Sequence, residues 1–272
     1  MKLRAHHISK KNNVSDFQNS LRIQTNVIKA LFMREMISHF GRYNIGFLWM
    51  FMEPMMFSVG IAILWSFSGK SYGVMSAAGF ALTGYSVIVA WRSCVGRTAA
   101  SIRANKGLLY HRNVTIIDIL FTRALFEFSA VTVSLLALTV LFYFLHLINY
   151  PIDAFKIIIA WILLGWFFIA SGLIASFLTE KSALFERIWH VLMYLTLPFT
   201  GALSMVSWLP IKIQELMLLS PMVNGIEMLR EGYFGSGINA HYSWEYLVVC
   251  NILLTTVSLH LINKIKKLMH GE

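Results

Sequence analysis

Six long apolar segments, separated by short polar connections, constrain this chain of 272 residues more than any other feature. A helix needs about 20 apolar residues to cross a hydrocarbon core of about 30 Å. We predict membrane-spanning helices over residues 45–67, 79–102, 116–147, 157–178, 188–206 and 246–263. Hydrophobic residues make up 57% of the chain and charged residues only 13%, which is too apolar for a soluble domain. The sequence therefore predicts an all-α polytopic membrane protein with six transmembrane helices per protomer.

The distribution of Lys and Arg predicts the orientation of these spans, because positive residues gather at cytoplasmic ends. They lie before the first span, in every second connection and after the last span: Arg34, Arg42, Arg103, Lys106, Arg112, Lys181, Arg187, Lys264, Lys266 and Lys267. The opposite side carries only Lys70, Lys156, Lys212 and Arg230. Both termini are therefore predicted to be cytoplasmic. The same topology signals, facing anionic lipid, account for the net charge of +10, so nucleic acid is not expected as a partner.

The residues before the first span are predicted to form two cytoplasmic segments. Residues 1–19 are basic and poor in apolar side chains, and we predict a flexible arm there. Within residues 20–44, Ile23, Val27 and Leu31 recur at every fourth position opposite a polar stripe. This pattern is typical of an amphipathic helix that lies in the membrane surface. We predict an interface and entrance region at its end, comprising Arg34, Glu35, Arg42, Trp49, Glu53 and Pro54, followed by a six-span transmembrane domain over residues 45–272.

Charged residues fall inside predicted spans, with Arg92 and Arg97 in the second and Asp118 and Glu127 in the third. An arginine in mid-bilayer costs about 2.5–3.5 kcal/mol, so these side chains should face protein, water or headgroups. Two interpretations remain open. The arginines either extend to lipid phosphates or pair with the carboxylates, or they form a cationic wall for an anionic substrate. We assign a substrate path to Arg92, Arg97, Trp91 and Tyr85, because aromatic rings can also stack on sugars.

Between the fifth and sixth spans, two apolar segments are too short to cross a membrane. Pro210 precedes residues 211–219, and Ser220 and Pro221 form a helix start that Gly232 can end. Two short re-entrant helices would satisfy their backbones in the outer leaflet better than a long loop. We predict that this segment forms a gate on the outer side, with Ser220, Pro221, Asn224, Glu227, Arg230 and Glu231 as its residues.

Catalytic, nucleotide-binding and metal-binding motifs are not found. Residues 69–71 read Gly-Lys-Ser, but Leu64 stands where a phosphate-binding loop requires its first glycine. The histidines lack metalloenzyme spacing, and Cys94 and Cys250 lie in apolar segments typical of buried thiols. We therefore predict no catalytic residue, no metal site and no cofactor in this chain. A membrane-bound glycosyl or acyl transferase is an alternative class, but it would need clustered carboxylates or histidines on one membrane side.

Three groups of motifs occur in order along residues 30–264. The first comprises Arg34-Glu35, Phe40-Gly41, Gly46, Leu48-Trp49 and Glu53-Pro54; the second residues 104–108, Ile117-Asp118 and residues 123–127; the third residues 220–223, Glu227 and residues 229–231. Together they resemble the permeases of polysaccharide-exporting ABC transporters, particularly the inner-membrane permease of Gram-negative capsular polysaccharide export. His39 and Asn44 depart from the family, whose members often have Arg or Lys there.

The resemblance implies a multi-pass permease of the bacterial inner membrane, without enzymatic activity of its own, that exports lipid-linked capsular polysaccharide for capsule biogenesis. It implies a homodimer with two cytoplasmic ABC ATPase subunits, which would bind ATP and Mg, and with periplasmic and outer-membrane export proteins. It places ATPase docking at Arg103, Asn105, Lys106, Gly107 and Leu108, and makes the outer segment a periplasmic gate. Export of O-antigen or teichoic acid is the alternative within the same class of transporter.

Overall fold

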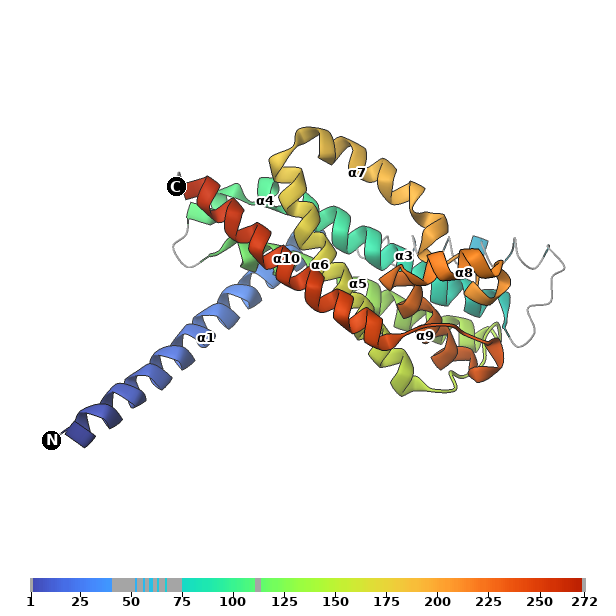
Figure 1. Cartoon of the computed structure of the whole chain (residues 1–272), viewed down its shortest axis with the longest axis horizontal. Coiled ribbons are helices and arrows are strands. Elements are labelled where there is room, and N and C mark those ends of the chain that lie inside the picture. Colours follow the sequence, from blue (N-terminus) through green and yellow to red (C-terminus); the bar gives the residue numbers. More distant parts are fainter. Residues whose placement is uncertain are drawn as a thin grey trace.

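The computed structural model describes residues 2–40, 75–110 and 114–270, with a few positions between 52 and 67, and this part of the chain is helical without strands. Most of the first predicted span, residues 45–67, lies outside the described residues. So do Arg42, Trp49, Glu53 and Pro54 of the predicted entrance region. The fold is therefore built from the remaining helices (Figure 1).

Four helices of the described part are long and apolar enough to cross a membrane. They are α3 (Ala77–Ala99), α5 (Ile116–Phe144), α6 (Ala154–Lys181) and α10 (Trp244–His270), and they match the second, third, fourth and sixth predicted spans. The side chains of Ser76, Thr115 and Asp153 cap the first three, because each accepts a hydrogen bond from a backbone N–H of the first turn. Local capping signals thus fix where these spans begin.

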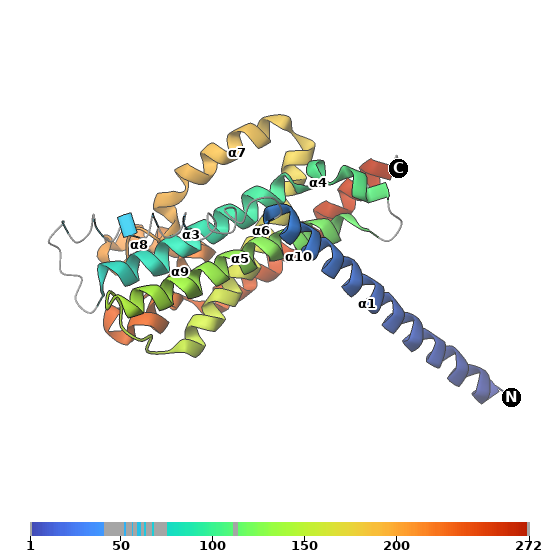
Figure 2. The ribbon, with the colours of Figure 1, turned by 180° about the vertical axis from the view of Figure 1, so that it is seen from behind.

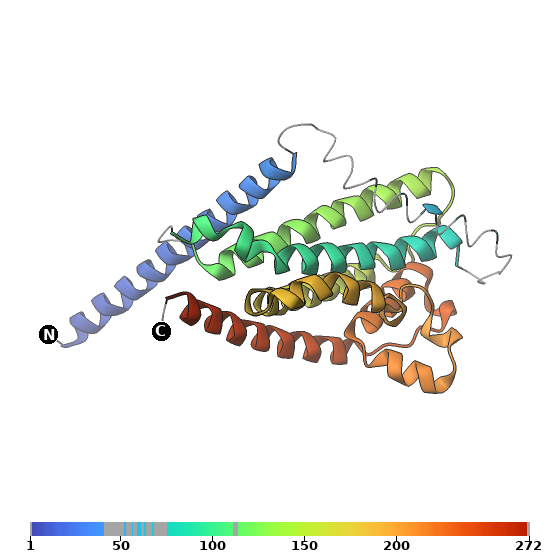
Figure 3. The same cartoon turned by 90° about the horizontal axis from the view of Figure 1, so that it is seen from above.

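The long helices lie side by side, and α3 runs through the inside of the bundle (Figure 3). It packs mainly against α5 and α6, while α6 also packs against α10 and α9 (Pro221–Phe234). The side chains of Leu82, Leu164 and Phe168 are completely buried at these contacts. Gly165 allows α5 and α6 to approach closely, since a Cβ there would lie 2.4 Å from the Phe128 ring. Most of α3 is therefore buried inside the bundle, while Arg92 is half-buried and Arg97 exposed.

Helix α1 (Lys2–Phe40) is a single helix that crosses the direction of the bundle (Figures 1 and 3). Its N-terminal half extends away from the other helices, and its C-terminal part lies against α5 (Figure 2). The helix includes residues 2–19 of the predicted arm, because residues 2–40 contain neither Pro nor Gly to interrupt it. The flexibility expected of this arm stays a prediction.

The segment between α6 and α10 differs from the predicted fifth span. Helix α7 (Ala183–Leu195) has 13 residues, which at 1.5 Å per residue is about 20 Å, too short to cross a membrane alone. The chain then forms short 3₁₀ turns, η2 (Leu197–Thr200) and η3 (Val206–Trp208), instead of continuing as a helix to residue 206. Pro198 and Gly201, whose φ is 76°, account for the interruption.

Two short helices follow, α8 (Ile211–Leu218) and α9, close to the two short segments that the sequence predicts. The turn η4 (Ser236–Ile238) joins α9 to α10. On the opposite end of the bundle, α4 (Ser101–Ala104) and η1 (Lys106–Tyr110) connect α3 towards α5. Re-entry into the outer leaflet and a total of six spans stay predictions.

Candidate functional site

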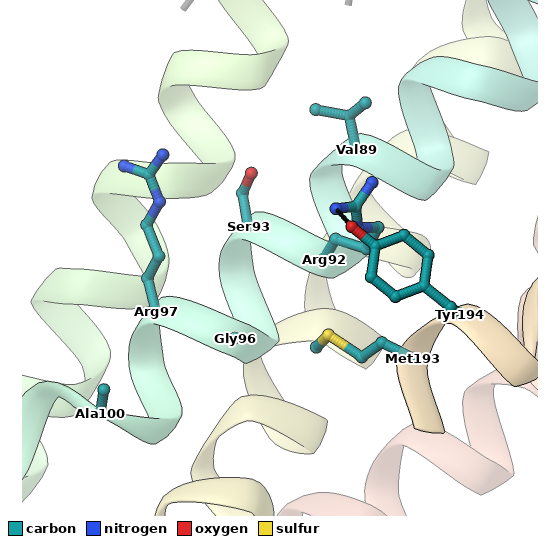
Figure 4. A pocket seen from close by; sticks show the side chains of 8 residues that line it. All are labelled: Val89, Arg92, Ser93, Gly96, Arg97, Ala100, Met193 and Tyr194. Atoms are coloured by element: carbon teal, nitrogen blue, oxygen red, sulfur yellow. Dashed lines mark hydrogen bonds between the residues drawn. The ribbon is translucent and has the colours of Figure 1, made fainter. Parts of the chain in front are cut away.

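A cavity of about 360 Å³ lies between α3 and α7, and both predicted substrate-path arginines line it (Figure 4). Its lining comprises Val89, Arg92, Ser93, Gly96, Arg97, Ala100, Met193 and Tyr194. The α3 residues recur every three or four positions, so they share one face of that helix. Trp91 and Tyr85 are not in this lining. Tyr85 is buried in the hydrophobic core, and Trp91 is half-buried and packs against that core.

Arg92 is held in this cavity by Tyr194 of α7. Its Nη2 donates a hydrogen bond of 2.7 Å to the Tyr194 hydroxyl, and its Cζ lies 4.6 Å from the centre of the Tyr194 ring. A guanidinium over an aromatic face gains a cation–π attraction in addition to the hydrogen bond. Sequence analysis did not assign Tyr194 to the path, because only tertiary packing brings α7 to α3.

Arg97 begins a row of alternating charges that leads from the cavity to α1. Its Nη1 lies 3.4 Å from Oε1 of Glu127 on α5, and the same oxygen lies 3.0 Å from Nη2 of Arg123. Arg123 also pairs with Glu35 of α1, which Arg34 contacts at 2.9 Å. We call Arg97, Glu127, Arg123, Glu35 and Arg34 the charge row. Both carboxylates are nearly inaccessible, whereas Arg97 keeps 42% of its side chain exposed.

Further contacts fix α1 on α5 next to this row. The rings of Phe32 and Phe126 meet edge to face with centres 5.5 Å apart, and Gln24 donates to Asp118. Arg34 also donates to Asn105, so the predicted interface and docking residues meet at one place. Asp118 acts in the helix cap with Thr115. Of the two predicted carboxylate partners, the structure pairs Glu127 with Arg97.

The predicted docking segment, Arg103 to Leu108, is attached to the end of α6. Arg103 donates to the Thr179 carbonyl at 2.6 Å and lies 3.4 Å from Glu180, which Lys106 also approaches at 3.5 Å. Gly107 is exposed and Leu108 half-buried. Glu180 was not recognised from the sequence, because its only local signal is a position next to Lys181 at a helix end. The segment is therefore anchored while part of it stays open to a partner.

The residues predicted for the outer gate form buried cross-links. Arg230 is completely buried, donates to the carbonyls of Gly201 (2.8 Å) and Ala202 (2.6 Å), and lies 3.8 Å from the centre of the Phe80 ring. Glu227, 3.8 Å from Arg230, accepts from the backbone N–H groups of Val206 and His241. Burial raises the pKa of Glu227 and lowers the pKa of Arg230 to about 9, because neither charge reaches water.

Four other predicted gate residues complete this outer region. Ser220 precedes α9 and Pro221 is its first residue, as expected, although the Ser220 side chain makes no capping hydrogen bond. Asn224 is buried, and its side-chain oxygen accepts from the Ser243 N–H at 2.8 Å. Glu231 pairs with Lys156 at 3.1 Å and accepts from Tyr242. These contacts fix α9 in place, and movement of α9 as a gate stays a prediction.

Within the described residues, no group of three or more His, Cys, Asp or Glu side chains is arranged to hold a metal ion. The cavity offers the guanidiniums of Arg92 and Arg97 beside the phenol of Tyr194. Such groups bind phosphates and carboxylates through charge-assisted hydrogen bonds.

Comparison with known proteins assigns this arrangement to a family. The model of the ABC-2 type transporter family matches residues 26–234. The chain belongs to this family. The matched range includes the C-terminal part of α1, the charge row, the cavity and α9.

Individual relatives cover almost the whole chain. The capsule polysaccharide export inner-membrane protein CtrC of Neisseria meningitidis serogroup B is 37% identical over 254 residues, which are 93% of this chain and 96% of CtrC. The protein of the same description in Haemophilus influenzae, BexB, is 37% identical over 92% of this chain and 95% of its own. The polysialic acid transport protein KpsM of Escherichia coli is 25% identical over 85% of this chain and 92% of its own.

Proposed function

We propose that this chain is the inner-membrane permease of an ATP-driven exporter of capsular polysaccharide, and that the polymer is linked to a lipid. The observation that carries this proposal is the similarity to CtrC and BexB, which extends over more than nine-tenths of each chain at 37% identity. The relatives are export proteins, which favours a permease over the transferase considered from the sequence. ATP and Mg would be bound by a partner subunit.

The anionic part of the substrate, in this proposal, passes the cavity between α3 and α7. Support comes from the two guanidiniums that line it, both on a helix that is otherwise buried and long enough to cross a membrane. A long polymer must be bound weakly at several points to keep moving, so two half-exposed charges suit it better than a closed pocket. Tyr194 would orient Arg92 towards such an anion.

The ATPase partner is proposed to dock on the segment from Arg103 to Leu108 beside the end of α1. The contacts of Arg103 with α6 and of Asn105 with Arg34 give this segment connections to two parts of the bundle. A rigidly attached segment transmits movement of a partner better than a free loop. Two ATPase copies, one for each protomer, would complete the transporter.

A second copy of the chain and export proteins on the periplasmic side are the other proposed partners. Helix α7 leaves apolar side chains uncovered along one face, including Leu184, Val191 and Leu195. Because α7 is too short to span a membrane alone, this face needs lipid or another protomer to cover it. A homodimer would supply that cover next to the cavity.

Export measured in cells that lack their own copy of the gene tests the proposed path. Arg92→Gln and Arg97→Gln, at matched membrane levels, are expected to lower surface polysaccharide at least about tenfold, whereas the Lys variants retain most export because they retain charge. Lys212→Gln, an exposed position on α8, is the matched control and should export normally. Normal export by both Gln variants would refute the cationic path. Polysaccharide export without any ATPase encoded by the genes next to this one would refute the transporter assignment.

A further inference from the structure

Arg97 is shared between the cavity and a carboxylate behind it. Its contact to Glu127 Oε1 is 3.4 Å, longer than the 3.0 Å contact of Arg123 to the same oxygen. Charge-assisted hydrogen bonds of full strength measure about 2.7–2.9 Å between heavy atoms. Of these two contacts to Glu127, that of Arg97 is thus the looser, and Arg97 is also the more exposed arginine, at 42% against 18%.

Glu127 does not need Arg97 to remain paired. Its side chain is 2% exposed, and a carboxylate so deeply buried is strongly destabilised without a cation beside it. Arg123 supplies that cation on the same helix, four residues earlier, and is itself fixed by Glu35 of α1. Departure of Arg97 would therefore leave an intact Glu35–Arg123–Glu127 group.

The cavity end of the row carries two cations. The guanidiniums of Arg92 and Arg97 both line the cavity. A phosphate or carboxylate that enters the cavity therefore meets both of them.

We propose that Glu127 is an internal counter-anion for Arg97. It pairs with Arg97 while no substrate group is bound there, and the anionic group of the substrate then displaces Glu127 from Arg97. This inference rests on the proposed function, since it assigns a positioning role in the same path. Glu127 weakens binding, because each arriving anion must compete with it. That competition keeps the path from retaining a polyanion, and it returns Arg97 to its resting position when the anion leaves.

The intact transporter, with its ATPase subunit, in phosphatidylcholine nanodiscs provides the test. The probe is dioctanoyl phosphatidic acid, whose phosphate stands for the anionic group, and dioctanoylglycerol is the uncharged control. Glu127→Gln is expected to bind phosphatidic acid roughly five- to tenfold more tightly than the wild type, with unchanged binding of dioctanoylglycerol. A merely structural role of Glu127 would give the opposite sign, since a damaged site binds more weakly.

Further variants separate this inference from the proposed function. Arg97→Gln should weaken phosphatidic acid binding, and adding Glu127→Gln to it should bring no gain, because the competitor then has no target. If Arg92→Gln and Arg97→Gln both bind like the wild type, the cationic path itself is wrong. If Arg97→Gln weakens binding but Glu127→Gln leaves it unchanged or weaker, only the counter-anion role is wrong. If Glu127→Gln fails to assemble, Glu127→Asp replaces it in the test. The shorter side chain draws the carboxylate away from Arg97, so phosphatidic acid should bind more tightly than to the wild type, by a smaller factor than expected for Glu127→Gln. Unchanged binding to Glu127→Asp would refute the proposal.

Discussion

Gly84 lies on α3 where that helix meets the buried Arg230. The methyl group that Gly84→Ala adds there tests how tightly the outer region is packed. A Cβ at this position would lie 2.5 Å from the Ala202 carbonyl oxygen and 2.9 Å from Arg230 Nη2. The first of these neighbours is backbone, and it accepts the 2.6 Å hydrogen bond from Arg230. It cannot move aside without breaking the cross-link between α9 and the turn around residue 202. We therefore expect Gly84→Ala to destabilise the fold.

The magnitude follows from two opposing terms. Replacing Gly by Ala inside a helix gains about 1 kcal/mol from backbone entropy. Overpacking against fixed atoms costs about 1–3 kcal/mol, and loosening a charge-assisted hydrogen bond costs about 1.5–3 kcal/mol more. The net destabilisation expected for Gly84→Ala is about 1.5–5 kcal/mol.

Gly96→Ala is the matched control on the same helix. A Cβ there meets only the flexible end of Met193, at 3.6 Å, so the entropy gain should appear without a clash. Thermal unfolding of both purified variants in one detergent is the assay. We expect Gly84→Ala to unfold on the order of 5–10 °C below Gly96→Ala. Equal unfolding temperatures, or a higher one for Gly84→Ala, would show that α3 and Arg230 do not meet as described.

Other predictions concern the cytoplasmic side and the topology. Val27 is half-buried and Leu31 buried on α1, the helix that packs against α5. Replacing both with Glu should release α1 and abolish co-purification of the ATPase; unchanged co-purification would contradict the docking of α1. Cysteines at Asn105 and Leu108 are expected to crosslink to the ATPase, and crosslinks found only near Lys181 would move the docking site. A cysteine at the exposed Lys212 should react with an impermeant reagent from the periplasm, and reaction only from the cytoplasm would overturn the predicted orientation.

The spans were predictable because they depend on neighbours in the sequence. Length and hydropathy placed α3, α5 and α6 to within three residues at each end and the start of α10 to within two. The start of α9 at Pro221 follows from a local signal too, a serine followed by a proline. The predicted fifth span ends at residue 206, beyond the end of α7 at Leu195. The apolar composition continues through Pro198 and Gly201, but the α-helix does not.

The sequence by itself also determined that the charges inside these spans need partners, since unpaired charge is costly in an apolar medium. It could not determine which partners they find. Tyr194 reaches Arg92 across 102 positions of sequence, and Glu35 reaches Arg123 across 88. Such pairs depend on how α7 and α1 pack against the bundle, and this packing arises from many weak apolar contacts that no local pattern encodes. Only the tertiary structure therefore decided that Arg97 pairs with Glu127, and that Glu227 and Arg230 of the predicted gate form buried cross-links.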